Sequence, residues 1–202
     1  MKSKYSLLVT ILCVMAASSL NAATWNVDAT HSNVQFSVKH MMVSTVHGSF
    51  NTFSGTATFD ETSPATVAFE GTVDASSVNT NNERRDGHLK SADFFDVANN
   101  PAITFKSTKS VMTAPGRYQV TGDLTMRGVK KEVTMAMEGL TDFIKGPKGA
   151  TRTGASLTTT INRHDFGLNW NKALDAGGVL VGDSVKINLD MELEKASDVS
   201  SK

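Results

Sequence analysis

The densest cluster of side chains that could carry chemistry is formed by Arg84, Arg85, Asp86 and His88. At the mouth of a pocket, the guanidinium groups and the imidazole could hold the polar headgroup of a ligand. The alternative is a solvated helix face whose exposed ion pairs each contribute less than about 1 kcal/mol. Of these two interpretations, we favour the solvated helix face.

The histidines are too irregularly spaced to predict a metal site. None of His31, His40, His47, His88 and His164 belongs to a His-Glu-x-x-His motif. The pattern instead predicts residues that form hydrogen bonds in loops or at the rim of a barrel. A hydrolase or isomerase that pairs His31 or His88 with a nearby acid remains an alternative.

No nucleophile motif accompanies these histidines. The chain has no Gly-x-Ser-x-Gly sequence, and its one cysteine, Cys13, lies in the N-terminal segment. The Asp-Phe-Gly sequence at 165–167 lacks the other kinase motifs. We therefore predict a protein that is not an enzyme, with no catalytic residue, metal or cofactor. Arg127 and Arg163 each lie near a strand end, where a buried Arg–Asp pair could lock one rim of a barrel.

The elements that must position these residues are strands. Apolar and polar side chains alternate with a period of two in about eight segments, as in half-buried strands. Turn residues at 61–64, 113–116 and 145–149 separate these runs and suit antiparallel connections. Many antiparallel strands in one all-β domain leave two architectures, a sandwich or a closed barrel. The apolar positions include Val34, Phe36, Val38, Phe53, Ala57, Phe59, Val67, Phe69, Val73, Ile103, Phe105, Tyr118, Val120, Leu124, Met126, Val133, Met135, Met137, Leu157, Ile161, Val185, Ile187, Leu189, Met191 and Leu193.

A short helical insertion interrupts the strands around residues 80–97. Thr80 and Glu83 have the spacing of a capping box, and apolar residues follow at Leu89 and at 94–95. The Asn-Asn-Pro sequence at 99–101 bounds the insertion. We expect one or two helical turns there.

The interior of a barrel with these strands is either packed or hollow. Gly55, Gly71 and Gly122 interrupt the inward faces, where glycine leaves room or permits a sharp bend. An eight-stranded barrel is just wide enough to hold one small ligand. Charged residues such as Lys39 and Glu70 lie on the opposite faces of the strands. Those faces belong in water, so the barrel is not predicted to span a membrane.

Residues 1–22 have the pattern of a secretory signal peptide. Lys2 and Lys4 precede a short apolar run, and small residues follow it. The chain has 20 basic and 20 acidic residues, and only Lys2 and Lys4 are charged within 1–22. The predicted mature chain, 23–202, is therefore slightly acidic and free of cysteine. This charge balance argues against a nucleic-acid partner.

The motifs in the mature chain resemble those of the YceI family, in order and over nearly its whole length. The resemblance is carried by Trp25-x-x-Asp28-x-x-His31-Ser32, Arg85-Asp86-x-His88-Leu89-x-Ser91-x-Asp93-Phe94-Phe95-Asp96, Gly122-Asp123-Leu124-Thr125-x-Arg127-Gly128-Val129, Ile161-Asn162-Arg163-x-Asp165-Phe166-Gly167 and Val181-Gly182-Asp183. It implies a periplasmic, lipocalin-like, eight-stranded antiparallel barrel with a helical insertion. It also implies binding of a long polyprenyl chain, an isoprenoid quinone or another amphiphile inside the barrel.

From alternation and resemblance together, we predict an exported protein that holds such a lipid for transport, storage or sequestration. A periplasmic enzyme of unknown reaction, or a packed barrel acting as an interaction or stress protein, is the alternative. The sequence leaves open whether the barrel forms a homodimer. The predicted ligand-binding wall consists of Phe36, Val38, Phe53, Phe69, Phe105, Leu124, Met126, Met135, Met137 and Leu189.

Overall fold

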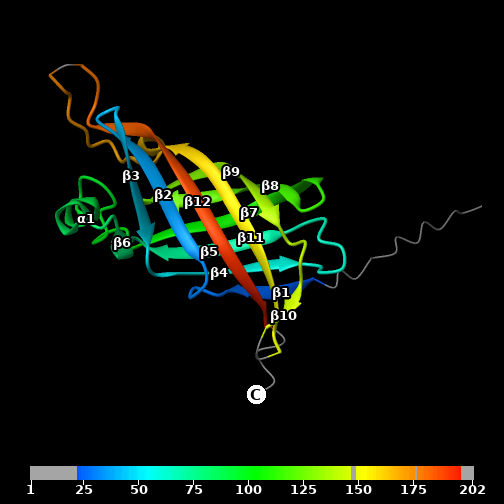
Figure 1. The fold of residues 1–202 in the computed structure, drawn as a ribbon. Coiled ribbons are helices and arrows are strands. Elements are labelled where there is room, and N and C mark those ends of the chain that lie inside the picture. Colours follow the sequence, from blue (N-terminus) through cyan, green and yellow to red (C-terminus); the bar gives the residue numbers. More distant parts are fainter. Residues whose placement is uncertain (1–21, 147–148, 176, 197–202) are drawn as a thin grey trace, which may run out of the picture.

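The alternating segments form strands in a computed structural model of the chain, which describes residues 22–146, 149–175 and 177–196 (Figure 1). The predicted signal peptide, Ala22 apart, lies outside the described residues. The strands are β1 (Ala23–Val27), β2 (Asn33–His40), β3 (Ser44–Phe50), β4 (Phe53–Phe59), β5 (Ala68–Asp74), β6 (Val78–Asn79), β7 (Ala102–Ala114), β8 (Arg117–Met126), β9 (Val129–Gly139), β10 (Ile144–Lys145), β11 (Thr151–Asn162) and β12 (Val181–Lys195).

The sheet closes on itself. β12 pairs with β11 along one edge and with both β1 and β2 along the other, and every pairing is antiparallel. β1 and β2 follow one another along β12, and β4 and β3 follow one another beside them. Each of these pairs therefore behaves as one bent strand, and the result is a closed eight-stranded antiparallel barrel. This confirms the predicted fold class and decides between the two architectures in favour of the barrel.

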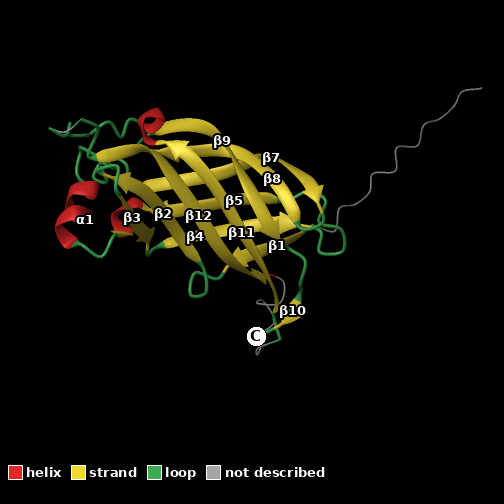
Figure 2. Cartoon of the chain, turned by 45° about the horizontal axis from the view of Figure 1, so that its top comes forward, coloured by secondary structure: helices red, strands yellow, loops and turns green. Residues whose placement is uncertain are grey.

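The helical insertion lies at one end of the barrel (Figure 2). It contains α1 (Glu83–Lys90), preceded by the short 3-10 helix η1 (Ala75–Ser77). The predicted capping box is wrong, because the Asn82 side chain caps α1 by accepting a hydrogen bond from the Arg85 N–H at 3.0 Å. Thr80 instead donates its N–H and hydroxyl to Asp86. A second 3-10 helix, η2 (Arg163–Phe166), follows β11. Among the described residues, no helix combines the length and apolar character needed to cross a bilayer.

The barrel interior contains two hydrophobic clusters. The first closes the end near β1 and β10, where Trp25 is fully buried and stacks on Phe59 with 5.0 Å between ring centroids. Phe143 packs against both rings. The second cluster lies toward α1 and includes Phe94 and Phe95, which follow the helix. Many side chains of this second cluster surround the space in which a ligand site can form.

A hydrophobic cavity inside the barrel

The barrel encloses a cavity of about 200 Å³ with almost entirely apolar walls. A single water needs only about 10–15 Å³ measured in this way, so the cavity is not a packing defect. Its walls come from the strands and from the insertion, which supplies Leu89, Phe94 and Phe95. The packed-barrel alternative expects no cavity, and the structure does not support it.

Of the three inward glycines, Gly71 leaves room in the cavity. Gly55 and Gly71 face each other across β4 and β5, and both line the cavity. A Cβ atom added at Gly71 would have only the Ser54 carbonyl oxygen within 4 Å, at 3.5 Å. Gly122 plays a different part, because an added Cβ would lie 2.4 Å from the Lys106 carbonyl oxygen. Gly122 therefore permits close strand packing rather than leaving room for a ligand.

The cavity wall contains all of the predicted wall residues except Met137. Met137 is 1% exposed and packs in the cluster around Trp25, because its place in β9 lies opposite Tyr118 at the closed end. We therefore leave Met137 out of the wall. The other predicted residues all line the cavity, and their contact with a ligand stays a prediction. These residues are Phe36, Val38, Phe53, Phe69, Phe105, Leu124, Met126, Met135 and Leu189.

The sequence reasoning missed several wall residues. Val185, Ile187 and Met191 line the cavity from β12 on the same face as Leu189. These three residues alternate with a period of two along the same strand as Leu189, and this pattern could have predicted that they face inward. Phe95 and Leu168 also line the cavity, but they lie in connecting segments where no periodicity indicates which side chains point inward.

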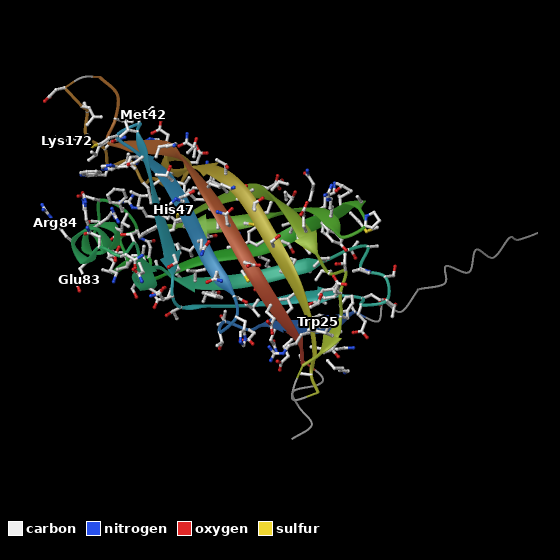
Figure 3. All side chains as sticks on the ribbon, viewed as in Figure 1. Trp25, Met42, His47, Glu83, Arg84 and Lys172 are labelled. Atoms are coloured by element: carbon white, nitrogen blue, oxygen red, sulfur yellow. The ribbon has the colours of Figure 1, made fainter. Side chains whose placement is uncertain are left out.

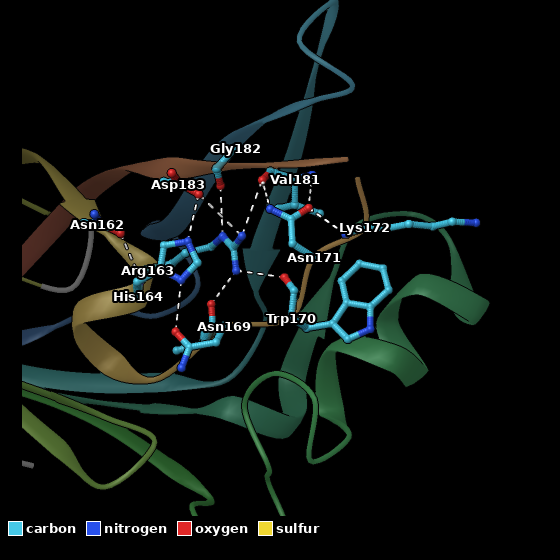
Figure 4. A network of polar contacts seen from close by, with 11 residues as sticks. Asn162, Arg163, His164, Asn169, Trp170, Asn171, Lys172, Val181, Gly182 and Asp183 are labelled. Atoms are coloured by element: carbon cyan, nitrogen blue, oxygen red, sulfur yellow. Dashed lines mark hydrogen bonds and ion pairs between the residues drawn. The ribbon is translucent and has the colours of Figure 1, made fainter. Parts of the chain in front are cut away.

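Arg163 is a buried cation at the rim of the cavity, and it is 3% exposed. Its Nε donates to the Gly182 carbonyl at 3.0 Å, and its terminal nitrogens donate to the carbonyls of Leu168, Trp170 and Val181 (Figure 4). Burial lowers the pKa of Arg163, and the carboxylate of Asp183 partly offsets this effect.

The Arg163–Asp183 pair, at 3.6 Å, is the predicted Arg–Asp pair at the barrel rim. The Arg163 side chain thereby holds residues 168–170 and 181–182 against η2. Because its nitrogens already have partners, Arg163 brings no free donor to the cavity.

Arg127 holds the other side of the same rim. One terminal nitrogen donates to the Gly167 carbonyl and the other to the Ala92 carbonyl, both at 2.8 Å. The side chain thus joins the segment after α1 to the end of η2. Like Arg163, Arg127 therefore connects separate segments of the rim by donating to backbone carbonyls.

The polar cluster of α1 is used within the protein as well. Arg85 donates to the hydroxyl and the carbonyl of Thr80, so its guanidinium does not form a headgroup site. His88 forms a 2.9 Å contact with Asp93 and packs edge-on against Phe94 and Trp170. Figure 3 shows Glu83 and Arg84 pointing away from the barrel. The favoured interpretation, a largely solvated helix face, describes this arrangement better than a headgroup site.

A second polar cluster lies where the chain bends between β1 and β2. The Asp28 carboxylate contacts His31 Nδ1 at 2.8 Å and Arg152 at 2.9 Å. Arg152 also pairs with Glu192 and Glu194. Asp28, His31 and Glu192 are close enough to hold a metal ion, but both carboxylates are already ion-paired with Arg152.

The electrostatics of this cluster are those of an ion-pair network. The hydrogen bond from His31 holds the pKa of Asp28 well below its usual range, and Asp28 raises the pKa of His31. Neither His31 nor His88 lines the cavity. Both histidines have the acidic neighbour that an enzyme would need, but neither pair is placed to act on a molecule in the barrel.

A closed antiparallel barrel with an apolar cavity in its interior defines a lipocalin-like class of fold. The YceI-like domain model matches residues 25–193, and the chain belongs to the YceI family, as the sequence resemblance predicted. The UPF0312 protein SA2479 of Staphylococcus aureus (strain N315) is 42% identical over 82% of this chain and 94% of its own length.

Solved structures show the same barrel. The Campylobacter jejuni YCEI protein is 31% identical, with a TM-score of 0.67 over 78% of this chain and 89% of its own. BcnA of Burkholderia cenocepacia is 24% identical, with a TM-score of 0.70 over 82% of this chain and 98% of its own. A polyisoprenoid binding domain from Saccharophagus degradans is 18% identical, with a TM-score of 0.62 over 86% of this chain and 99% of its own. At these sequence identities, the similarity to BcnA and to the polyisoprenoid binding domain shows the fold alone.

Proposed function

We propose that this protein is a non-enzymatic binding protein that holds a long-chain polyprenyl or isoprenoid-quinone-like lipid in the barrel. The observation that carries this proposal is the apolar cavity, whose wall is formed by Phe, Val, Leu, Ile and Met side chains. The Saccharophagus degradans neighbour, described as a polyisoprenoid binding domain, supports the choice of ligand.

The wall chemistry separates the two ends of an amphiphilic ligand. Hydrocarbon buried in the cavity gains roughly 25 cal/mol per Å² before ordering costs are subtracted. A charged or strongly polar headgroup would lose its hydration on entering the cavity. Arg163 could not compensate for this loss, because its donors are already bound to carbonyls and to Asp183. The lipid tail therefore enters the barrel and the headgroup stays at the rim near α1.

The proposed location is the periplasm, after export by a signal peptide in residues 1–22. In that aqueous space an isoprenoid tail needs a carrier, because its transfer into water is unfavourable. Transport, storage and sequestration all require the same cavity. We propose that the barrel serves one of these roles.

The ligand is tested by what the purified protein retains and takes up. Organic extraction followed by mass spectrometry should recover a polyprenyl lipid or an isoprenoid quinone. Delipidated protein should bind ubiquinone with a long isoprenoid tail. Recovery of no lipid, together with no uptake of ubiquinone, would contradict the proposal.

A cavity-filling variant links uptake to the barrel interior. Gly71→Leu places a side chain into the cavity, because an added Cβ meets only the Ser54 carbonyl oxygen. We expect it to weaken ubiquinone binding at least about tenfold, while the protein remains folded. Gly154→Leu is the matched control, since Gly154 is exposed on β11 and its Cβ position also has free space. Equal binding by both variants would place the ligand elsewhere.

A further inference from the structure

The tip of the β2–β3 hairpin exposes three consecutive apolar residues. Met41, Met42 and Val43 are 43%, 64% and 83% exposed. They lie in a four-residue turn that is closed by a hydrogen bond from the Val43 N–H to the His40 carbonyl. Side chains this large and apolar seldom stand together in water, and a contiguous group of them marks a contact surface.

The backbone of this turn makes its sequence unusual. Met41 and Met42 have φ values of 51° and 63°, in the left-handed region. Hairpin turns with two such residues strongly favour Asn-Gly, since other side chains are strained there. Methionine at both positions weakens the turn and contributes nothing to the core. Residues that break a local rule without a structural gain point to a function.

The tip lies at the rim of the lipid cavity. The Met41 N–H donates to the Leu180 carbonyl at 2.8 Å, and His40 pairs with Val181 of β12. Val181 and Val38, three residues before Met41, both line the cavity. Figure 3 shows Met42 at the end of the barrel opposite Trp25, which belongs to the closed end. The exposed tip is therefore a near neighbour of the cavity wall, although it does not line the cavity itself.

Two lysines lie close to the tip. Residues 29–59 contain no Asp or Glu, and Lys39 is the one lysine among them. The adjacent loop adds Lys172, whose carbonyl accepts a hydrogen bond from the Leu180 N–H at 2.9 Å, and Leu180 in turn accepts from Met41. Both lysines are exposed, and neither forms an ion pair within the part of the chain that the structure describes. Asp175 and Asp183 are the nearest acids in sequence to this loop and strand end.

We propose that Met41, Met42 and Val43 insert into the interface of a lipid bilayer that contains anionic lipids. Apolar side chains enter the headgroup–acyl boundary, while neighbouring lysines contact anionic headgroups. This docking brings the rim of the cavity to the membrane surface, so that a lipid tail passes between bilayer and barrel with little exposure to water. The inference rests on the proposed function and adds the surface through which the lipid is exchanged.

The decisive variant carries both Met41→Asn and Met42→Gly. Asn-Gly suits this turn better than Met-Met, so the variant should be at least as stable as the wild type. Flotation with vesicles of phosphatidylcholine and anionic phosphatidylglycerol should show binding by the wild type and at least about tenfold weaker binding by the variant. Met112→Asn is the control, because it removes an exposed methionine near Tyr118 and the closed end.

The charge is tested separately. Lys39→Gln with Lys172→Gln should weaken binding to the anionic vesicles by about fivefold per lysine, and should leave binding to pure phosphatidylcholine vesicles unchanged. Equal vesicle binding by the wild type and the Asn-Gly variant would overturn the proposal. Sedimentation that shows Met41 and Met42 joining two copies of the chain would also overturn it.

Ubiquinone uptake from detergent-free solution separates the two proposals. The Asn-Gly variant should still take up ubiquinone, because its cavity is unchanged. Uptake without vesicle binding by the wild type would overturn the membrane surface alone. Vesicle binding without ubiquinone uptake would overturn the lipid-binding function, and with it the proposal that lipid is exchanged at this surface.

Discussion

The buried Arg163 side chain donates to four backbone carbonyls and pairs with the more exposed Asp183. Arg127 works in the same way on two further carbonyls. At the scale of single residues, the terminal nitrogens of both guanidinium groups thus donate to backbone carbonyls, while Arg127 Nε is buried without a partner in the described part of the chain. What remains to meet a ligand is hydrocarbon, which sets the chemistry of the site.

The first prediction concerns the buried guanidinium of Arg163. Arg163→Lys keeps the charge but cannot reproduce the planar set of donors, so several buried carbonyls lose their partners. We expect a loss of about 2–4 kcal/mol in the free energy of unfolding. Urea denaturation measures this, and hydrogen exchange should accelerate in residues 168–182. Arg84→Lys on the exposed face of α1 is the control, with a change below about 0.5 kcal/mol.

The second prediction concerns Tyr118, whose buried hydroxyl has no hydrogen-bond partner within the described part of the chain. Burial raises the pKa of this phenol. Tyr118→Phe removes an unsatisfied polar group and keeps the ring, so we expect stability to stay equal or rise by about 1 kcal/mol. Tyr118→Ala, in contrast, should cost about 3–5 kcal/mol through the cavity that it creates. A clear loss of stability in Tyr118→Phe would mean that the hydroxyl has a partner.

At the scale of elements, the bend between β1 and β2 lets one chain segment pair with two parts of β12. The Asp28–His31–Arg152 cluster ties this bend to β11, and Glu192 and Glu194 tie it to β12. Backbone pairing alone does not connect these parts of the bend to β11. The cluster is therefore an ion-pair network that connects the bend to β11 and β12.

The third prediction is that the stability contributed by this ion-pair network depends on pH. Asp28 raises the pKa of His31 above 6.5, so the contribution of protonated His31 is fully present below pH 6.5. That contribution is lost as the pH rises through the raised pKa. Asp28, with its lowered pKa, stays ionised throughout this range. His31→Ala should therefore cost more stability at about pH 5 than at about pH 8.5. Thermal unfolding measures the difference, which should disappear in an Asp28→Asn background.

At the scale of the whole molecule, the sheet closes into a barrel, and the cavity lies beside the packed cluster around Trp25 and is lined by much of the second cluster. Stability then depends on packing and on pairing, because the barrel contains no cysteine. A ligand that fills the cavity binds only the folded state. Ligand binding and folding are for this reason coupled.

The fourth prediction follows from that coupling. Ubiquinone at about 100 times its Kd should stabilise the folded protein by about 2.7 kcal/mol. For a domain of this size, the gain corresponds to an increase in Tm of about 5–10 °C. Differential scanning calorimetry of delipidated protein measures the shift. Gly71→Leu should show little or no shift, and a full shift in that variant would indicate binding outside the barrel.

Much of the cavity wall was predictable because a strand has an exact period of two. Once Phe36 or Leu124 is assigned inward, every second residue in that strand follows. Met137 shows the limit of this rule. It has the correct face, but periodicity carries no information about depth along the barrel axis, and Met137 lies past the cavity beside Trp25.

The sequence by itself determined the strands, the antiparallel order, the helical insertion and the family, since these depend on local patterns and on motifs in order. Only the tertiary structure decided that the barrel is hollow, that Arg163 and Arg127 bind carbonyls, and that the Met41–Val43 tip lies at the rim of the cavity. Each of these features requires residues far apart in the chain to meet. Their meeting is fixed by register and closure, which no local pattern encodes.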